Sequence, residues 1–203
     1  MSEAGATPTR RNRTPSAVVE RELLAAAEAV LVRDGPGKLT IRAVAAEAGI
    51  APMGVYNRLG GKDGLVDALL IKGFTRLTAA IDCGDESDLA ERLRSCGLRY
   101  RAFALDNRHF YAIMFEGAIP RGHDVAEVEQ HARAPFAALV RNVELAATAG
   151  VVEVPDPLEA AQQIWSTVHG AVTLELRGLI LTPDPDATYR ALMETFIRGL
   201  APR

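Results

Sequence analysis

The sequence predicts an all-α fold of about nine helices, and three observations carry that prediction. Apolar residues recur at three- and four-residue steps through most of the 203 residues, the period of a helix that packs on one face. Clusters of glycine and proline separate these periodic segments. No segment shows the sustained alternation of apolar and polar residues that is typical of a half-buried strand. Apolar residues make up 48% of the chain, which is enough for a sizeable core.

The first helix is predicted to run from near Pro15 to Arg33. Thr14 is a suitable N-cap, and proline is well tolerated at the first helical position. The sequence Asp-Gly-Pro-Gly at 34–37 ends the helix, because two glycines and a proline cannot continue it. The residues predicted to face inward are Val19, Leu23, Ala26, Ala27, Val30 and Leu31.

Two short helices are predicted within residues 40–59, TIRAVAAEAGIAPMGVYNRL. Thr40 is placed to cap the first helix, and Gly49 is suited to a left-handed C-cap. Residues 51–52, Ala-Pro, begin the second helix, and the two glycines at 60–61 end it. The residues predicted to face inward are Ile41, Val44, Ala45 and Ala48 in the first helix and Val55 and Leu59 in the second. These parts form a helix-turn-helix, a motif whose second helix enters the major groove of DNA.

The remainder of the chain is predicted to be a bundle of longer helices. A fourth helix opens at residues 62–63, with Leu65, Val66, Leu69, Leu70, Phe74 and Leu77 inward. Further helices are expected over 87–107, 109–116, 124–149 and 157–181, and a final helix follows Pro183-Asp184-Pro185. We therefore expect a basic arm over 1–13, a DNA-binding domain over 14–61 and a helical domain over 62–203.

The distribution of charge agrees with a DNA-binding N-terminal part. Residues 1–62 carry a net charge of +3, whereas residues 63–203 carry −6. A basic N-terminal part followed by an acidic remainder indicates that only the N-terminal part contacts a polyanion. The arginines clustered at 10–13 lie in a segment expected to be flexible, which either contributes to DNA binding or is a solvated tail.

Composition also restricts the class of protein and its compartment. Two cysteines, Cys83 and Cys96, make no disulfide framework, and a reducing cytosol is the natural setting. The N-terminus has no apolar core of a signal peptide, and no apolar run approaches the roughly 18 residues of a membrane span. We expect a cytoplasmic protein without membrane association.

Enzyme motifs are not found, and we expect neither a catalytic site nor a cofactor. No Gly-x-Ser-x-Gly occurs, and Cys96 has the spacing of a plain core thiol. His123, Glu127 and His131 recur at four-residue steps, but His123 and His131 would lie about 12 Å apart on one helix, too far to share a metal ion. No metal site is expected.

The segment from Thr40 to Leu65 resembles the signature of the TetR family of regulators, without gaps. The matching residues are Tyr56, Asn57, Leu59, Lys62, Asp63 and Leu65. The resemblance is strong over residues 15–75, and Trp165-Ser-Thr-Val-His169-Gly170 is similar to a Trp…His-Gly helix of one subgroup of TetR-type C-terminal domains. It implies a homodimeric repressor that leaves a palindromic double-stranded DNA operator when it binds a small molecule. The chain departs from the family pattern at Ala51, Pro52, Met53, Leu59, Gly60 and Gly61.

Given this motif, eight residues are expected to contact DNA: Thr40, Arg42, Ala51, Pro52, Met53, Tyr56, Asn57 and Lys62. Lys62 begins a helix where charge and free N–H groups meet phosphate, and Tyr56 and Thr40 offer hydroxyl groups. Asn57 can pair with adenine, and Met53 can contact a thymine methyl. Each is otherwise an ordinary solvated residue.

An effector pocket is expected where large apolar and polar-tipped side chains concentrate: Phe103, Phe110, Tyr111, Met114, Phe115, Trp165 and His169. These walls suggest an apolar or aromatic ligand, with His169, Tyr111 or Arg101 orienting a polar end. The alternatives are that the aromatics only fill a core, and that the regulator has no small-molecule effector and is constitutive or controlled by a protein partner.

A homodimer interface is expected from the last two helices, because the helix over 157–181 is apolar on more than one face. Its candidate residues are Val172, Leu176, Leu179, Met193, Phe196 and Ile197. Two helices from each subunit would form a four-helix contact. The alternative is that these apolar residues fill the core of a monomer.

Overall fold

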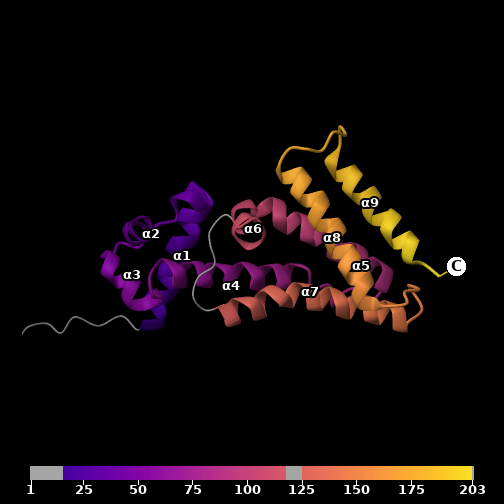
Figure 1. The fold of residues 1–203 in the computed structure, drawn as a ribbon, viewed down its shortest axis with the longest axis horizontal. Helices are drawn as coiled ribbons and strands as arrows, with labels where there is room; N and C mark the ends of the chain where they lie inside the picture. Colours follow the sequence, from indigo (N-terminus) through magenta and orange to yellow (C-terminus); the bar gives the residue numbers. More distant parts are fainter. Residues whose placement is uncertain (1–15, 118–124, 203) are drawn as a thin grey trace, which may run out of the picture.

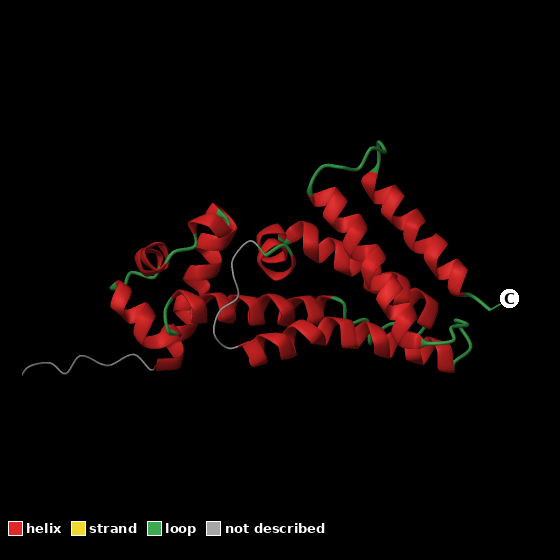
Figure 2. Ribbon diagram, viewed as in Figure 1, coloured by secondary structure: helices red, strands yellow, loops and turns green. Residues whose placement is uncertain are grey.

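The computed structural model describes residues 16–117 and 125–202, and these residues fold into nine α-helices and a short 3₁₀ turn, with no strand (Figure 2). The predicted all-α fold is confirmed. The helices are α1 (Ser16–Asp34), α2 (Ile41–Glu47), α3 (Pro52–Leu59), α4 (Lys62–Ala80), α5 (Leu89–Asp106), α6 (Arg108–Phe115), α7 (Val125–Thr148), α8 (Pro157–Leu176) and α9 (Pro185–Leu200); the turn η1 (Pro36–Lys38) follows α1. The predicted arm and the predicted cap at Thr14-Pro15 lie outside the described residues.

The helices form a small head and a longer body (Figure 1). Helices α1, α2 and α3 gather at one end, and α4 leads from this head along the body beside α7. Helices α8 and α9 lie at the other end, packed on α5. Helix α4 therefore belongs to both parts.

The predicted inward faces of the head and of α4 are buried or packed against the core, as expected. Leu23, Val44, Val55 and Leu65 are fully buried, and they belong to one continuous core that extends into the body. At about 25 cal/mol per Å² of buried apolar surface, each such side chain contributes about 1.5–3 kcal/mol to folding. The head is thus held to the body by shared core packing.

The predicted turn residues adopt the expected backbone conformations. The Thr40 hydroxyl caps α2 by accepting a hydrogen bond from the Ala43 N–H at 3.2 Å. Gly49 has φ of +67°, and the Ile50 N–H donates to the Ala45 carbonyl at 3.0 Å. This arrangement is a glycine C-cap, and it fixes the angle at which the chain enters α3.

The predicted end of the eighth helix is wrong: α8 ends at Leu176, not at Leu181. Gly178 takes the left-handed conformation with φ of +67°, and the Leu179 N–H donates back to the Leu174 carbonyl at 2.9 Å. Apolar residues continue at helical spacing beyond this glycine, and the prediction therefore extended the helix too far. Leu181 is 98% exposed in the single chain.

An ion-pair cluster also connects the head to α4. The Glu28 carboxylate of α1 lies 2.5 Å from the Lys72 ammonium and 2.5 Å from the Arg76 guanidinium. Burial raises the pKa of Glu28, but the hydrogen bonds and charges of the two cations outweigh burial and leave that pKa below its ordinary value. The pairs therefore favour one orientation of α1 on α4.

No helix in the described part of the chain has both the length and the apolar character needed to cross a membrane.

Candidate functional site

Helices α2 and α3 pack together through small and branched side chains, and this leaves one side of α3 free. Ala45 is 1% exposed and Val55 is fully buried between the helices. On the opposite side, Met53 is 65% exposed and Tyr56 is 53% exposed. These two side chains are therefore available for contact with another molecule.

All eight predicted DNA-contacting residues are exposed in the described chain: Thr40, Arg42, Ala51, Pro52, Met53, Tyr56, Asn57 and Lys62. Their exposure is what contact with DNA requires, but exposure alone does not test the contact. Their assignment to phosphate or base edges stays a prediction.

Two helices in this region begin without a side-chain cap from their N-cap residue. The N-cap residues are Ala51 for α3 and Gly61 for α4, and neither makes a side-chain hydrogen bond to its helix. The first N–H groups of a helix without such a cap carry a partial positive charge and suit a phosphate. Lys62, the first residue of α4, adds a full charge at the same end.

Gly61 fixes the position of Tyr56 relative to Lys62. A Cβ atom added at Gly61 would lie 3.1 Å from the Tyr56 ring, so the ring lies directly on the backbone between α3 and α4. Gly61 also has φ of +97°, a conformation that other residues rarely adopt. The sequence reasoning treated Gly61 only as a tolerable N-cap and missed this contact.

Two further glycines permit close packing in the head, and sequence reasoning missed both. A Cβ at Gly54 would lie 2.8 Å from the Ile50 side chain, and a Cβ at Gly64 would lie 1.7 Å from the Leu59 carbonyl oxygen. The sequence did contain a signal for this packing. A glycine inside a helix lowers helix stability by about 1 kcal/mol relative to alanine, and it is therefore expected only where close packing or function requires it.

Four of the seven predicted pocket residues come together in the body. Tyr111 and Phe115 of α6 meet Trp165 and His169 of α8, with the His169 ring 4.7 Å from Phe115 and 4.3 Å from Trp165 between centroids. Tyr100 of α5 joins them at 4.9 Å from His169, and Phe136 of α7 reaches Trp165 at 5.7 Å. We call these six side chains the aromatic cluster; its members from α5 and α7 were not predicted.

The other three predicted pocket residues lie outside the aromatic cluster. Phe110 and Met114 pack on α4, where a Cβ at Gly73 would lie 3.0 Å and 2.7 Å from them, and Phe103 is buried in the core. Arg101, considered for a polar ligand end, is engaged instead: its guanidinium binds Glu175 of α8 and Asp186 of α9, each at 2.7 Å. It joins three helices of the body.

His169 presents an unsatisfied hydrogen-bond acceptor inside the aromatic cluster. Its Nδ1 lies 3.0 Å from the Trp165 carbonyl, so Nδ1 carries the proton and donates. Burial lowers the pKa of His169 to about 4, against the weaker opposing effect of that hydrogen bond, so the ring is neutral and Nε2 is an acceptor. Nε2 is buried without a hydrogen-bond partner among the described residues.

The candidate dimer surface is partly free and partly occupied. Leu179 is 56% exposed, and Leu176, Phe196 and Ile197 are partly exposed. Val172 and Met193 are covered by their own subunit, where the Met193 side chain would lie 2.6 Å from a Cβ at Gly97 of α5. In this conformation those two residues offer no surface to a second chain.

An exposed α3 on a helix-turn-helix head, with an all-helical body behind it, defines a DNA-binding protein of the helix-turn-helix class. Two family models match the chain: that of the bacterial regulatory proteins of the tetR family over residues 23–69, and that of the tetracycline-repressor-like C-terminal domain over residues 93–196. The chain therefore belongs to the TetR family, and it is a DNA-binding transcriptional regulator. Members of this family typically dimerise.

Solved structures agree with this assignment. A protein of unknown function from Rhodococcus sp. RHA1 has 31% identity and a TM-score of 0.82, covering 97% of this chain and 100% of that one. A regulatory protein in the tetR family from Rhodococcus RHA1 has 25% identity and a TM-score of 0.69, covering 91% and 98%. The fatty acid degradation regulator FadR from Bacillus halodurans shares the fold at 17% identity and a TM-score of 0.70, covering 89% and 98%. No curated protein is significantly similar in sequence.

Proposed function

We propose that the protein is a ligand-responsive repressor: a homodimer that binds a palindromic operator and leaves it when a small apolar or aromatic effector enters the aromatic cluster. The observation that carries this proposal is a buried polar atom without a partner, His169 Nε2. A buried polar atom without a partner costs about 1–3 kcal/mol, which a bound molecule could recover. Mostly apolar walls with a few polar groups are typical of ligand sites.

The protonation of His169 restricts the chemistry of the effector. Because Nε2 is an acceptor, the group that meets it is a hydrogen-bond donor, such as a phenolic hydroxyl. A small void beside Tyr100 and Trp165, also lined by Ile164, has a volume of only about 10 Å³. An effector larger than water must therefore move side chains or helices, and that movement is the proposed signal.

Helix α6 is suited to pass this movement to the head. It carries Tyr111 and Phe115 of the aromatic cluster, and the Tyr111 hydroxyl lies 3.1 Å from the Thr173 hydroxyl. Its Phe110 packs on α4 at Gly73, and its His109 lies beside Gly35, where a Cβ would be 3.7 Å away. A displaced α6 would thus push on α4 and on the end of α1 together.

For DNA recognition we propose that four residues bind phosphates: Lys62, Tyr56, Thr40 and Arg42. Asn57 and Met53 contact base edges, and Ala51 and Pro52 lie close to the DNA.

For assembly we propose that the partly exposed apolar residues of α8, α9 and the segment after α8 meet their copies across a two-fold axis. A dimer is needed because one head covers only a half-site, and two half-sites lie about 34–36 Å apart.

The proposal is tested with the operator selected from a random DNA pool. Operator release is then measured with 2-naphthol and with 2-methoxynaphthalene, which has nearly the same shape but no donor. We expect release by 2-naphthol at lower concentration, and loss of that preference in His169→Phe. Equal release by the two compounds would remove the role of His169, and no release by any member of a wider aromatic panel would favour a regulator without a small-molecule effector.

A further inference from the structure

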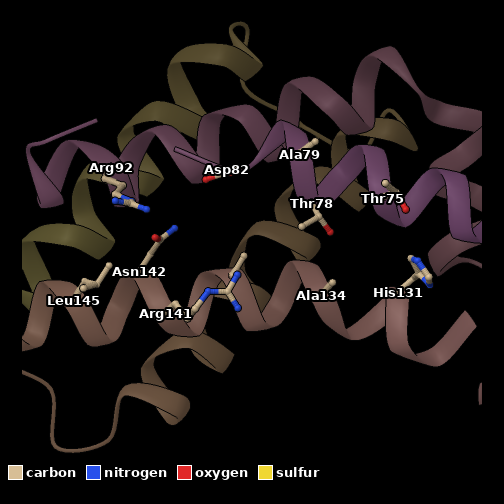
Figure 3. A pocket seen from close by; sticks show the side chains of 11 residues that line it. Thr75, Thr78, Ala79, Asp82, Arg92, His131, Ala134, Arg141, Asn142 and Leu145 are labelled. Atoms are coloured by element: carbon tan, nitrogen blue, oxygen red, sulfur yellow. The ribbon is translucent and has the colours of Figure 1, made fainter. Parts of the chain in front are cut away.

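A wide groove in the described part of the chain lies outside the aromatic cluster. It runs between α4 and α7, with the start of α5 at one end, and has a volume of about 450 Å³ (Figure 3). Pockets for small ligands range over about 300–1,000 Å³. None of its lining residues belongs to α6, α8 or α9, so it is separate from both the proposed effector site and the proposed dimer surface. We call it the α4–α7 groove.

The lining combines cations with an apolar floor. Arg92 of α5 and Arg141 of α7 supply two positive charges at one end, and Asp82 supplies the only carboxylate among the described lining residues. The Asp82 carboxylate already accepts a hydrogen bond from the Gly84 N–H at 3.1 Å. Ala79, Ala134, Ala138 and Leu145 contribute apolar groups to the lining, and Thr75, Thr78 and His131 contribute polar groups away from the arginines (Figure 3). The groove therefore has a net positive end and an apolar stretch.

Neither arginine forms an ion pair with a described residue. The side chains of Arg92 and Arg141 make no ion pair or hydrogen bond to any described residue, although most other arginines of the body do. The Nε of Arg92 is buried without a hydrogen-bond partner. A guanidinium is always charged, so this buried N–H is a donor that an anion would satisfy.

Asn142 is a second, independent sign of a ligand. It is only 5% exposed, it lines the groove, and its side-chain amide makes no hydrogen bond to a described residue. Figure 3 shows the Asn142 amide pointing from α7 into the space below Arg92, beside Arg141. The Asn142 amide and the guanidinium of Arg92 face the same space (Figure 3).

We propose that the α4–α7 groove binds an amphipathic monocarboxylate, with its carboxylate on Arg92, Arg141 and Asn142 and its apolar part along Ala79, Ala134 and Ala138. One charge suits the site, because two guanidinium groups face one carboxylate of the protein. The apolar floor favours an organic acid over an inorganic anion. Such a ligand joins α4 to α7, and so it acts on the helix that begins at the DNA-binding head.

The binding test uses the full chain and a matched pair of probes. 4-Phenylbutyrate and the uncharged 4-phenylbutanol are titrated by calorimetry, with inorganic phosphate as a third probe. We expect the carboxylate to bind and the alcohol to bind at least about tenfold more weakly, because charge-assisted hydrogen bonds are lost. Arg92→Gln and Arg141→Gln are each expected to weaken 4-phenylbutyrate about tenfold, and Asn142→Leu to weaken it less.

Two variants serve as controls. Arg133→Gln removes an exposed arginine of α7 that pairs with Glu129 outside the groove, and it should leave affinity unchanged. His169→Phe alters only the aromatic cluster and should also leave affinity unchanged. A melting curve for each variant shows whether it is folded.

Three results would overturn the proposal: equal affinity for the alcohol, phosphate binding as tight as that of the carboxylate, or affinity that depends on His169 and not on Arg92 and Arg141. The last result would place the carboxylate in the aromatic cluster, and it would also contradict the hydrogen-bond donor that His169 Nε2 requires there. Conversely, failure of naphthol to release DNA would not affect carboxylate binding in the groove.

Discussion

The contact between α3 and α4 predicts a strong effect from the smallest possible substitution, Gly64→Ala. The added methyl group would lie 1.7 Å from the Leu59 carbonyl oxygen, far inside the 3.0 Å that real Cβ contacts keep. The obstacle is backbone at the end of α3, so no side chain can rotate out of the way. The two helices must separate or α4 must bend.

The magnitude follows from two opposing effects. Alanine inside a helix is favoured over glycine by about 1 kcal/mol, whereas forcing a methyl group into packed structure costs about 1–3 kcal/mol, and more where backbone must move. Because this clash is with backbone, we expect a net loss of about 2 kcal/mol or more in the free energy of unfolding. The shift also separates Tyr56 on α3 from Lys62 on α4, so operator affinity should fall beyond what the loss of folded protein explains.

Urea unfolding followed by circular dichroism gives the free energy, and fluorescence anisotropy with operator DNA gives the affinity. Gly199→Ala is the matched control, because Gly199 lies inside α9 and its added methyl group would meet no atom within 4 Å. The control should be neutral or slightly stabilising. If Gly64→Ala is as stable as Gly199→Ala and binds DNA normally, the close approach of α3 and α4 is not real.

Other substitutions test the remaining assignments. Lys62→Ala should lower the affinity for all DNA sequences about equally and reduce the salt dependence of binding by about one ion. Asn57→Ala should instead change the base preference at one position by about 1–3 kcal/mol. If both variants lose affinity equally for all sequences, the proposed orientation of α3 on the DNA is wrong. Leu179→Asp and Phe196→Asp should each give a monomer in sedimentation and lose operator binding. Leu179 is 56% exposed, so its substitution does not disturb the core. If both variants remain dimeric, the proposed interface is wrong. For His169, burial lowers the pKa from 6.5 to about 4, so its neutral form stabilises the fold above about pH 6.5, and that stability is lost as pH falls toward 4. Wild type should lose about 2 kcal/mol between pH 7.5 and 5 that His169→Phe retains; equal pH slopes in urea unfolding would refute the buried neutral ring.

The fold could be predicted from the sequence because its determinants are local. Thr40 caps its own helix, Gly49 adopts its left-handed turn, and the inward positions of α1 and α4 repeat every three or four residues. Helix ends were predictable where proline or glycine follows the last apolar residue. The end of α8 was not, because apolar residues continue past Gly178 for a reason other than core packing.

The sites were less predictable because they depend on contacts between segments far apart in the sequence. Tyr100 and Phe136 belong to the aromatic cluster through the packing of α5 and α7 on α8, which no spacing within one helix reveals. The unpaired Arg92 and Asn142 are likewise recognisable only once their surroundings are known. Sequence reasoning located the region of the cluster through Trp165 and His169, and it missed the α4–α7 groove.

The length of α4 sets how small a movement in the body is enough to change DNA binding. At 1.5 Å per residue, its 19 residues form a rod about 28 Å long, with Lys62 at one tip and the α4–α7 groove near the other. A tilt of about 5° about the far end would sweep Lys62 through about 2 Å, which is comparable to the reach of a hydrogen bond. In a two-fold dimer both tips would swing, and the separation of the heads would change by up to twice that distance. A ligand that adds only a few atoms of bulk to the body would then change the separation of the two heads enough that they no longer match the spacing of the two half-sites.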